Sequence, residues 1–200
     1  MSQDTETRPV FQRGQRRAPA LLQIAGRDAC LVVHLTHLDP NEEGWPAGLV
    51  DVLSNASVLK IGVGIDDDAI DLWEHFGYEV NGRLDLSGVH TEGDAARGMA
   101  GLRSLVTNFL GVDLVKSSSI AKSNWECRPL SHRQLVYAAL DSWAGREVYR
   151  KLAKLAPDPF APAAARELVG AESRRAPGTR PPDHWSACLL AWRRPLFQLA

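Results

Sequence analysis

The stretch "VLKIGVGIDDDAIDLWEHFG", residues 58–77, places two patterns of secondary structure directly one after the other. Residues 58–65 are β-branched and nearly continuously apolar, which predicts a strand buried on both faces. The second half predicts a helix that ends near Gly77, with apolar residues on one face. These residues are Ala69, Leu72, Trp73 and Phe76. A buried strand that leads directly into an amphipathic helix is typical of an α/β sheet.

The flanking sequence adds further elements of both kinds. The apolar runs at 20–26 and 29–35 are separated by a turn-like Arg-Asp pair, which predicts an antiparallel hairpin. A short strand is predicted around Asp85, and short helices near residues 45–55 and 101–111. A long helix begins after Ser131, which forms a capping box with Gln134. We therefore expect a mixed α/β sheet in one domain.

The chain has 200 residues, which suits one domain with a tail and allows a substantial core. We interpret residues 1–156 as the folded domain. Residues 157–200 are rich in Pro, Ala and Arg, so we predict a partly disordered tail. The formal net charge is −1, so attraction to nucleic acid requires a local basic patch.

The cysteines and the hydropathy bear on location. Cys30, Cys127 and Cys188 are odd in number and have no CxxC spacing, which is typical of free thiols in a reducing compartment. No apolar run approaches the ~18 residues of a membrane span, and the N-terminus lacks the apolar core of a secretory signal. We expect an intracellular protein of the nucleus, the cytoplasm or an organelle matrix, neither secreted nor membrane-bound.

Acidic side chains lie at the boundaries of the predicted elements. Asp4 and Glu6 are two residues apart in a strand-like start, so both side chains point to one face. Asp68 lies in the first turn of the helix after the buried strand. Tyr137 and Asp141 are one turn apart on the last predicted helix. Carboxylates that converge from separate elements are the usual ligands of Mg²⁺ or Mn²⁺.

Each of these groups also has an explanation without function. The helix dipole alone favours Asp68 at a helix start, and Asp4 and Glu6 belong to a terminal segment that can simply be solvated. A tyrosine four residues before an aspartate is a common chance spacing, and the ring of Tyr137 can pack in the core. The histidines show no metal-binding spacing and the glycines form no phosphate-binding loop, so other catalytic classes have little support.

Four segments taken together resemble a known family. They are "DTETRP" from Asp4, "KIGVGIDDDAIDL" from Lys60, "LVTNFLGVDLVKSSSIAKSNWECRPLS" from Leu105 and "YAALDSWAGREVYRKL" from Tyr137. In this order they resemble the 3′–5′ exonucleases of the DEDDy type. Within that type the chain is most similar to the Werner-syndrome-exonuclease-like domains, which are related to ribonuclease D. The resemblance covers residues 4–154.

The resemblance implies a ribonuclease-H-like α/β fold, with a five-stranded mixed sheet flanked by helices. It also implies hydrolysis at the 3′ end of DNA or RNA with two divalent cations, Mg²⁺ or Mn²⁺. Asp4, Glu6 and Asp141 match the ligands of a first ion. Asp4 also reaches a second ion, which Asp68 supports. Tyr137 matches the tyrosine that positions the attacking water.

The segment "VKSSSIAKSNWECRP", residues 115–129, is polar, rich in serine and basic. We hypothesise that Lys116, Asn124 and Arg128 line the path of the nucleic acid. The alternative is a solvated loop that Trp125 anchors to the core. Nothing in the sequence separates DNA from RNA as the substrate, because no element reports on the 2′-hydroxyl.

The start of the chain departs from the family pattern. Only Met1, Ser2 and Gln3 precede Asp4, where family members have an apolar central strand. The first strand is therefore predicted to be truncated and to fray, so that its carboxylates are held loosely. This leaves a second function open, a catalytically weak or inactive nuclease-fold module that binds nucleic acid or a protein partner.

Overall fold

The computed structural model describes residues 1–10, 17–38, 45–89 and 100–155. The strands are β1 (Ser2–Glu6), β2 (Leu21–Ala25), β3 (Cys30–His34), β4 (Lys60–Gly62) and β5 (Arg83–Asp85). The α-helices are α1 (Ala47–Ser54), α2 (Ile65–Phe76), α3 (Leu102–Leu105), α4 (Ser118–Ala121) and α5 (His132–Leu155). Short turns of other helix types are η1 (Leu35–His37), η2 (Leu86–Gly88) and the π-helical η3 (Val106–Leu110).

The strands form one mixed sheet in the order β3-β2-β1-β4-β5. β1 is the central strand, antiparallel to β2 and parallel to β4. β2 and β3 form the predicted antiparallel hairpin, and β4 and β5 run parallel. The expected five-stranded mixed sheet is confirmed, and it is the ribonuclease-H-like arrangement.

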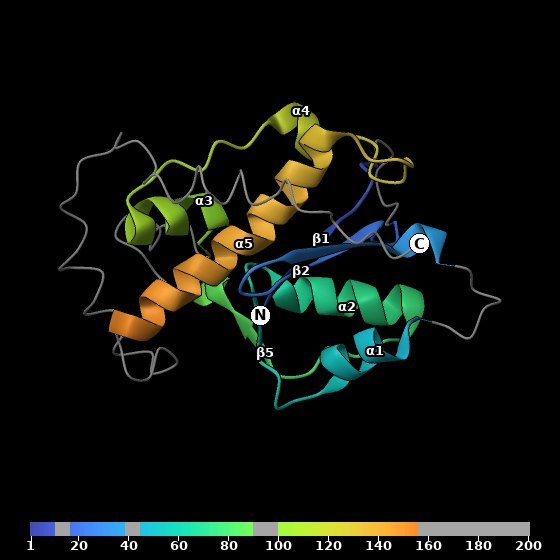
Figure 1. Ribbon diagram of the computed structural model, residues 1–200, viewed down its shortest axis with the longest axis horizontal. Coiled ribbons are helices and arrows are strands. Elements are labelled where there is room, and N and C mark those ends of the chain that lie inside the picture. Colours follow the sequence, from blue (N-terminus) through green and yellow to red (C-terminus); the bar gives the residue numbers. More distant parts are fainter. Residues whose placement is uncertain (11–16, 39–44, 90–99, 156–200) are drawn as a thin grey trace.

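Helices cover both faces of this sheet (Figure 1). Alternate residues of β2 point to opposite faces: Leu22 packs in the cluster with α1 and α2, and Leu21 packs in the cluster with α5. Ala69 and Leu72 of α2 are buried as predicted, but the prediction that Trp73 shares their face is wrong, because its side chain is 55% exposed. The sheet therefore lies between two apolar layers.

The first strand is complete in its pairing, so the prediction that it frays is wrong. Each residue from Ser2 to Glu6 has a partner in β2, and Ser2 and Gln3 are buried. Large apolar side chains are not required, because the hydroxyl of Ser2 donates to the carbonyl of Ile61 in β4. α5 also packs closely against Ser2, because position 145 of the helix is a glycine. A Cβ added at Gly145 would lie 2.9 Å from the Oγ of Ser2.

The predicted end of α2 and the predicted start of α5 are confirmed. Gly77 follows α2 with φ of 74°, in the left-handed region that glycine adopts without strain. At the start of α5 the Oγ of Ser131 accepts from the N–H of Gln134, and the Gln134 Oε1 accepts from the N–H of Ser131. Among the residues that the structure describes, no helix has both the length and the apolar character needed to cross a bilayer. The predicted tail, residues 157–200, lies outside the described residues.

At Gly62, β4 passes close to the backbone of β1. A Cβ added there would lie 2.6 Å from the backbone carbonyl oxygen of Gln3, and a backbone atom of a central strand cannot move aside without loss of pairing. We expect Gly62→Ala to lower the melting temperature by roughly 5 °C or more, at about 2–4 °C per kcal/mol for a domain of this size. Differential scanning calorimetry measures the change.

Gly48 in α1 provides the control, because a Cβ added there meets nothing within 4 Å. Gly48→Ala is expected to leave the melting temperature unchanged or to raise it, since alanine favours the helix. Equal melting temperatures for the two variants would contradict the close approach of β1 and β4.

Candidate active site

Three carboxylates from two elements meet on the face of the central strand that α5 covers. Asp4 and Glu6 alternate along β1 and face α5, which contributes Asp141. One ligand oxygen of each lies within 4.8 Å of the others. Asp141 is 5% exposed, and Gly145, one turn further along α5, packs on β1 as described above. The sequence prediction that these three acids converge agrees with this geometry.

Lys116 reaches into this carboxylate group from the segment between η3 and α4. Its Nζ lies 2.7 Å from Oδ2 of Asp141 and 5.8 Å from the centre of the Tyr137 ring. The lysine that the sequence placed on the substrate path thus lies beside a predicted metal ligand. Its ammonium offsets part of the negative charge there.

Tyr137 lies one turn before Asp141 on α5 and has two kinds of contact. Its ring is tilted against that of Trp125, with centroids 5.8 Å apart. Trp125 is fully buried, and its Nε1 donates to the carbonyl of Ala121. The predicted anchoring of this loop by Trp125 is therefore observed. The Tyr137 hydroxyl also lies close enough to Asp141 to oppose the rise in the pKa of that carboxyl, so its ring packs while its hydroxyl faces the carboxylates.

Asp68 lies next to the three acids but has a different partner. Its Oδ1 accepts a 2.7 Å hydrogen bond from the hydroxyl of Thr5, the residue between Asp4 and Glu6 on β1. Asp68 is also close enough to Asp4 to raise the pKa of that carboxyl. The helix dipole acts on any acid in this first turn, but the contact with β1 gives this acid a defined place at the site.

Burial raises the pKa values of all four acids, and repulsion from nearby acids adds to it for Asp4, Glu6 and Asp68. Burial is the larger cause for Asp4, with Asp68, Asp141 and Glu6 adding to it. The pKa of Glu6 rises to about 8, through burial and then the nearby Asp141. The pKa of Asp68 rises to about 7, chiefly through burial. Burial also raises that of Asp141, against the opposing effect of Lys116.

This charge distribution fits a divalent cation. Lys116 acts on three of the acids and pairs directly with Asp141. The oxygens of these three acids lie close enough to share an ion. Carboxylate oxygens are the hard ligands that Mg²⁺ and Mn²⁺ prefer, and a bound cation relieves the repulsion that raises the pKa values. Of the acids, Asp4 and Asp141 also line an adjoining cavity.

The cavity adjoins the carboxylates on the side of Ser2 and has a volume of about 150 Å³. Its walls come from β1, the end of β4, α3, α5 and the segment that carries Lys116. The lining residues are Ser2, Gln3, Asp4, Gly62, Val63, Leu102, Lys116, Asp141 and Gly145. A space of this volume accepts a ring-sized group, so the cavity can receive part of a nucleoside.

The other two residues predicted on the nucleic-acid path lie in the loop after α4. Asn124 is exposed, but its Oδ1 accepts from the N–H of Glu126 and its carbonyl accepts from Gln134. These bonds shape the loop. Arg128 is exposed, close enough to lower the pKa of His34. Contact of Asn124 or Arg128 with nucleic acid stays a prediction.

Two residues at the site escaped the sequence analysis. Thr5 lies between two acids in the sequence, and its hydrogen bond to Asp68 depends on packing between β1 and α2. Gln23 lies opposite Asp4 on β2 and is fully buried. Its amide has no hydrogen-bond partner among the described residues. A glutamine inside the apolar run at 20–26 was the signal for it.

Comparisons with known proteins agree with this geometry. A family model described as 3′–5′ exonuclease matches residues 1–156, and the chain belongs to this family. The bifunctional 3′-5′ exonuclease/ATP-dependent helicase WRN of Mus musculus is 33% identical over 153 residues, which cover 76% of this chain and 11% of that protein. A 3′-5′ exonuclease of Arabidopsis thaliana is 33% identical over 154 residues, 76% of this chain and 52% of the relative. The chain thus spans about half or less of these relatives.

Solved structures show the same fold. The EXO domain of Nibbler from Aedes aegypti superposes with a TM-score of 0.61 at 25% identity, and 84% of each chain is covered. Ribonuclease D of Escherichia coli superposes with a TM-score of 0.58 at 23% identity, over 97% of this chain and 49% of that one. The latter likeness concerns the fold alone.

The raised pKa values predict how stability depends on pH. Between the unfolded pKa values near 4 and the folded values, about 7 for Asp68 and about 8 for Glu6, the folded chain binds more protons than the unfolded chain. Stability therefore falls as pH rises through this window. The lowered pKa values of the Met1 amino group and of His34 act in the opposite direction, as two groups against several acids.

We expect the metal-free protein to melt at a lower temperature at pH 8 than at pH 6.5. Saturating Mn²⁺ is expected to raise the melting temperature more at pH 8, because the ion replaces the protons. Scanning fluorimetry in chelator and in Mn²⁺ measures both effects. Glu6→Gln removes one of the acids and should flatten the pH dependence. A melting temperature in chelator that rises between these two pH values would contradict the argument.

Proposed function

We propose that this chain is a metal-dependent 3′–5′ exonuclease that hydrolyses the terminal phosphodiester of DNA or RNA and releases nucleoside monophosphates. The observation that carries the proposal is the group of Asp4, Glu6 and Asp141, with Tyr137 facing it from α5. The membership in the 3′–5′ exonuclease family supports the same reaction.

The carboxylates divide into two sets of potential ligands. Asp4, Glu6 and Asp141 would hold one Mg²⁺ or Mn²⁺ ion, and Asp4 together with Asp68 would hold a second. When bound, divalent cations stabilise the charge that develops on the attacking and leaving oxygens of a phosphodiester. The chemistry of the donor set, four carboxylates with raised pKa values, supports this assignment.

The other residues of the site orient the reacting groups. The pKa of Tyr137 is raised by burial and by the nearby acids, so its hydroxyl stays protonated. Its proton is directed at Asp141, and its oxygen can accept a hydrogen bond that fixes the attacking water. Trp125 fixes the tyrosine ring. The cavity beside Ser2 receives the terminal nucleoside, which places its phosphodiester over the carboxylates.

The alternative of a weak or inactive binding module rested on a frayed first strand. β1 is fully paired with β2, and both of its acids lie beside Asp141 of α5. The argument for a weak or inactive module therefore no longer applies. An intracellular location stays a prediction. It is supported by Cys30 and Cys127, the two cysteines within the described ranges, which are free thiols.

Replacement of Asp141 tests the metal site. Asp141→Asn keeps the size of the side chain and removes its charge. Even the loss of a residue that only hydrogen-bonds a metal ligand costs about 10–100-fold in metal affinity or activity. We therefore expect loss of a direct ligand to lower the activity by more than about 100-fold. The measurement is release of nucleoside monophosphates from 3′-labelled DNA and RNA strands in Mg²⁺ or Mn²⁺, with and without excess chelator.

Asp113→Asn is the matched control, because Asp113 is an exposed acid paired with Arg103. It should retain the activity of the unaltered chain. Full activity of Asp141→Asn, or activity that persists in chelator, would refute the metal-dependent mechanism.

Replacement of Tyr137 tests the positioning of water. Tyr137→Phe keeps the ring against Trp125 and removes only the hydroxyl, so stability should change little. We expect kcat to fall by roughly 100-fold with little change in KM, because a misplaced nucleophile costs about this much. Tyr149→Phe, three turns further along α5, should leave kcat unaltered. Equal kcat values for the two variants would assign Tyr137 to packing alone.

A further inference from the structure

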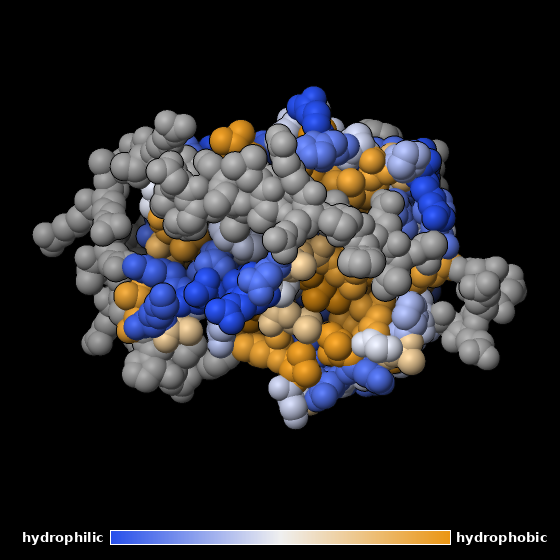
Figure 2. Space-filling model, in the orientation of Figure 1, coloured by the Kyte–Doolittle hydropathy of each residue, from blue (hydrophilic) through white to orange (hydrophobic). Residues whose placement is uncertain are grey.

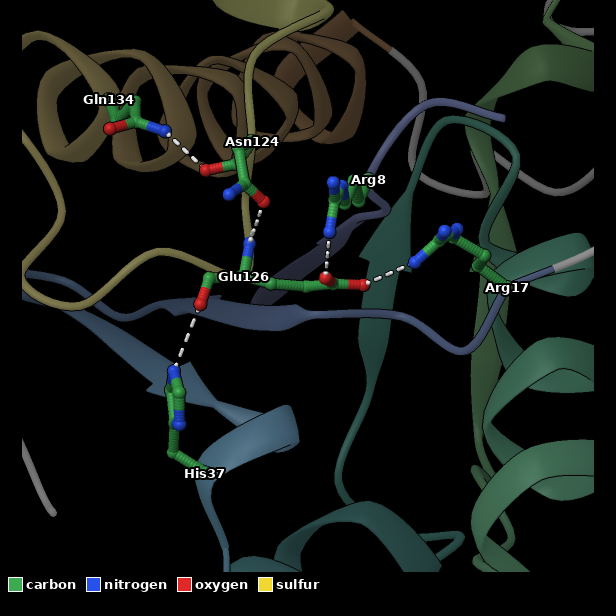
Figure 3. Close-up of polar contacts among 6 residues, drawn as sticks. All are labelled: Arg8, Arg17, His37, Asn124, Glu126 and Gln134. Carbon is green, nitrogen blue, oxygen red and sulfur yellow. Dashed lines mark hydrogen bonds and ion pairs between the residues drawn. The ribbon is translucent and has the colours of Figure 1, made fainter. Parts of the chain in front are cut away.

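Two arginines converge on one glutamate beyond the end of β1. The Nη1 of Arg8 lies 2.8 Å from Oε2 of Glu126, and the Nη1 of Arg17 lies 3.1 Å from Oε1. Figure 3 shows the two guanidinium groups approaching the carboxylate from different directions. Their side chains are 43% and 41% exposed. Two positive charges share one negative charge, so a net positive charge remains at the surface.

Glu126 is held from several sides. Its N–H donates to Oδ1 of Asn124, whose carbonyl accepts from the side chain of Gln134 at the start of α5. Its own carbonyl pairs with Nε2 of His37 at 3.0 Å (Figure 3). Hydrogen bonds from Arg8 and then Arg17 lower the pKa of its carboxyl. A fixed and ionised carboxylate therefore orients both arginines.

Arg8 follows the carboxylates of β1 after a few residues of chain. Ser2 and Asp4 border the cavity, Glu6 ends β1, and Arg8 follows two residues later. Four residues of extended chain reach at most about 14 Å, which is the length of a few stacked nucleotides at about 3.4 Å each. A strand whose last nucleoside enters the cavity therefore has its upstream phosphates within reach of Arg8.

The sequence between the two arginines is basic as well. The whole chain has a net charge of −1, whereas residues 8–17 contain four arginines and no acidic residue. Arg8 and Arg17 are the described members of this set. Glu126 binds one nitrogen of each, while a guanidinium has five N–H donors in a fork that suits phosphate.

From these observations we propose that Arg8 and Arg17, oriented by Glu126, form a subsite for the phosphodiesters of the substrate strand upstream of the scissile bond. This inference rests on the proposed exonuclease function. It differs from a structural role, in which the ion pairs only fasten the loop at 124–127 to the rest of the domain.

The first experiment measures binding of a ten-nucleotide single strand as KCl is varied, on the non-cleaving Asp141→Asn background. Each phosphate contact contributes about −0.7 to the slope of log affinity against log salt for single strands. Arg8→Gln combined with Arg17→Gln should make the slope shallower by about 1.4, and each single change by about half of that.

Two controls separate charge from structure. Arg150→Gln removes an exposed arginine of α5 that also pairs with a glutamate, Glu147, and should leave the slope unchanged. In Figure 2 the C-terminal part of α5 forms a hydrophilic band on the surface. Glu126→Gln breaks the same ion pairs but keeps both arginines, so it should also preserve the slope. An unchanged slope in the double arginine variant, or an equal loss in Glu126→Gln, would overturn the subsite.

The second experiment compares two substrates in the otherwise unaltered enzyme. The double arginine variant should lose roughly ten-fold in kcat/KM on the oligonucleotide, since two charged contacts are removed. It should keep its rate on the p-nitrophenyl ester of a nucleoside 5′-monophosphate, which has no upstream phosphate. Equal losses on both substrates would overturn the subsite. If the unaltered chain cleaves neither substrate, the proposed function fails, and the salt slope still decides the role of the arginines.

Discussion

The close packing of α5 on β1 brings together acids that are more than 130 residues apart in the sequence. Gly145 allows the helix to approach Ser2 so closely that a Cβ there would lie 2.9 Å from the serine Oγ. One turn earlier, Asp141 then faces Asp4 and Glu6. Burial of these acids together is unfavourable, as their raised pKa values show. The site tolerates this cost because a lysine offsets part of the charge and divalent cations can offset the rest.

The same constraint explains the composition of β1. A central strand normally contributes large apolar residues to both faces, but this one contributes a small serine where α5 touches it and two acids at the candidate active site. Its stability comes from full pairing with β2 and from the apolar layers that its neighbours form on both faces. A sheet can therefore carry a polar strand at its centre when the strands beside it supply the core.

The loop before α5 has a comparable double role. Trp125 is buried against Tyr137, and the next residue, Glu126, fastens the loop to both ends of the β1–β2 connection through Arg8 and Arg17. One short segment thus positions Tyr137 on one side and the two arginines on the other. Such coupling gives rigidity to groups that must be held within fractions of an ångström.

The sequence by itself determined the elements and the identity of the site. Hydrophobic periodicity is local, so β4, α2 and the start of α5 were predictable, and the spaced motifs pointed to the acids. The tertiary structure alone decided what depends on pairing between distant segments. Examples are the full pairing of β1 with β2 and the ion pair of Lys116 with Asp141. Another is the ion pair of Arg8 with Glu126, which lies 118 residues away in sequence. No local pattern encodes such contacts, because they exist only once the sheet and its helices have packed.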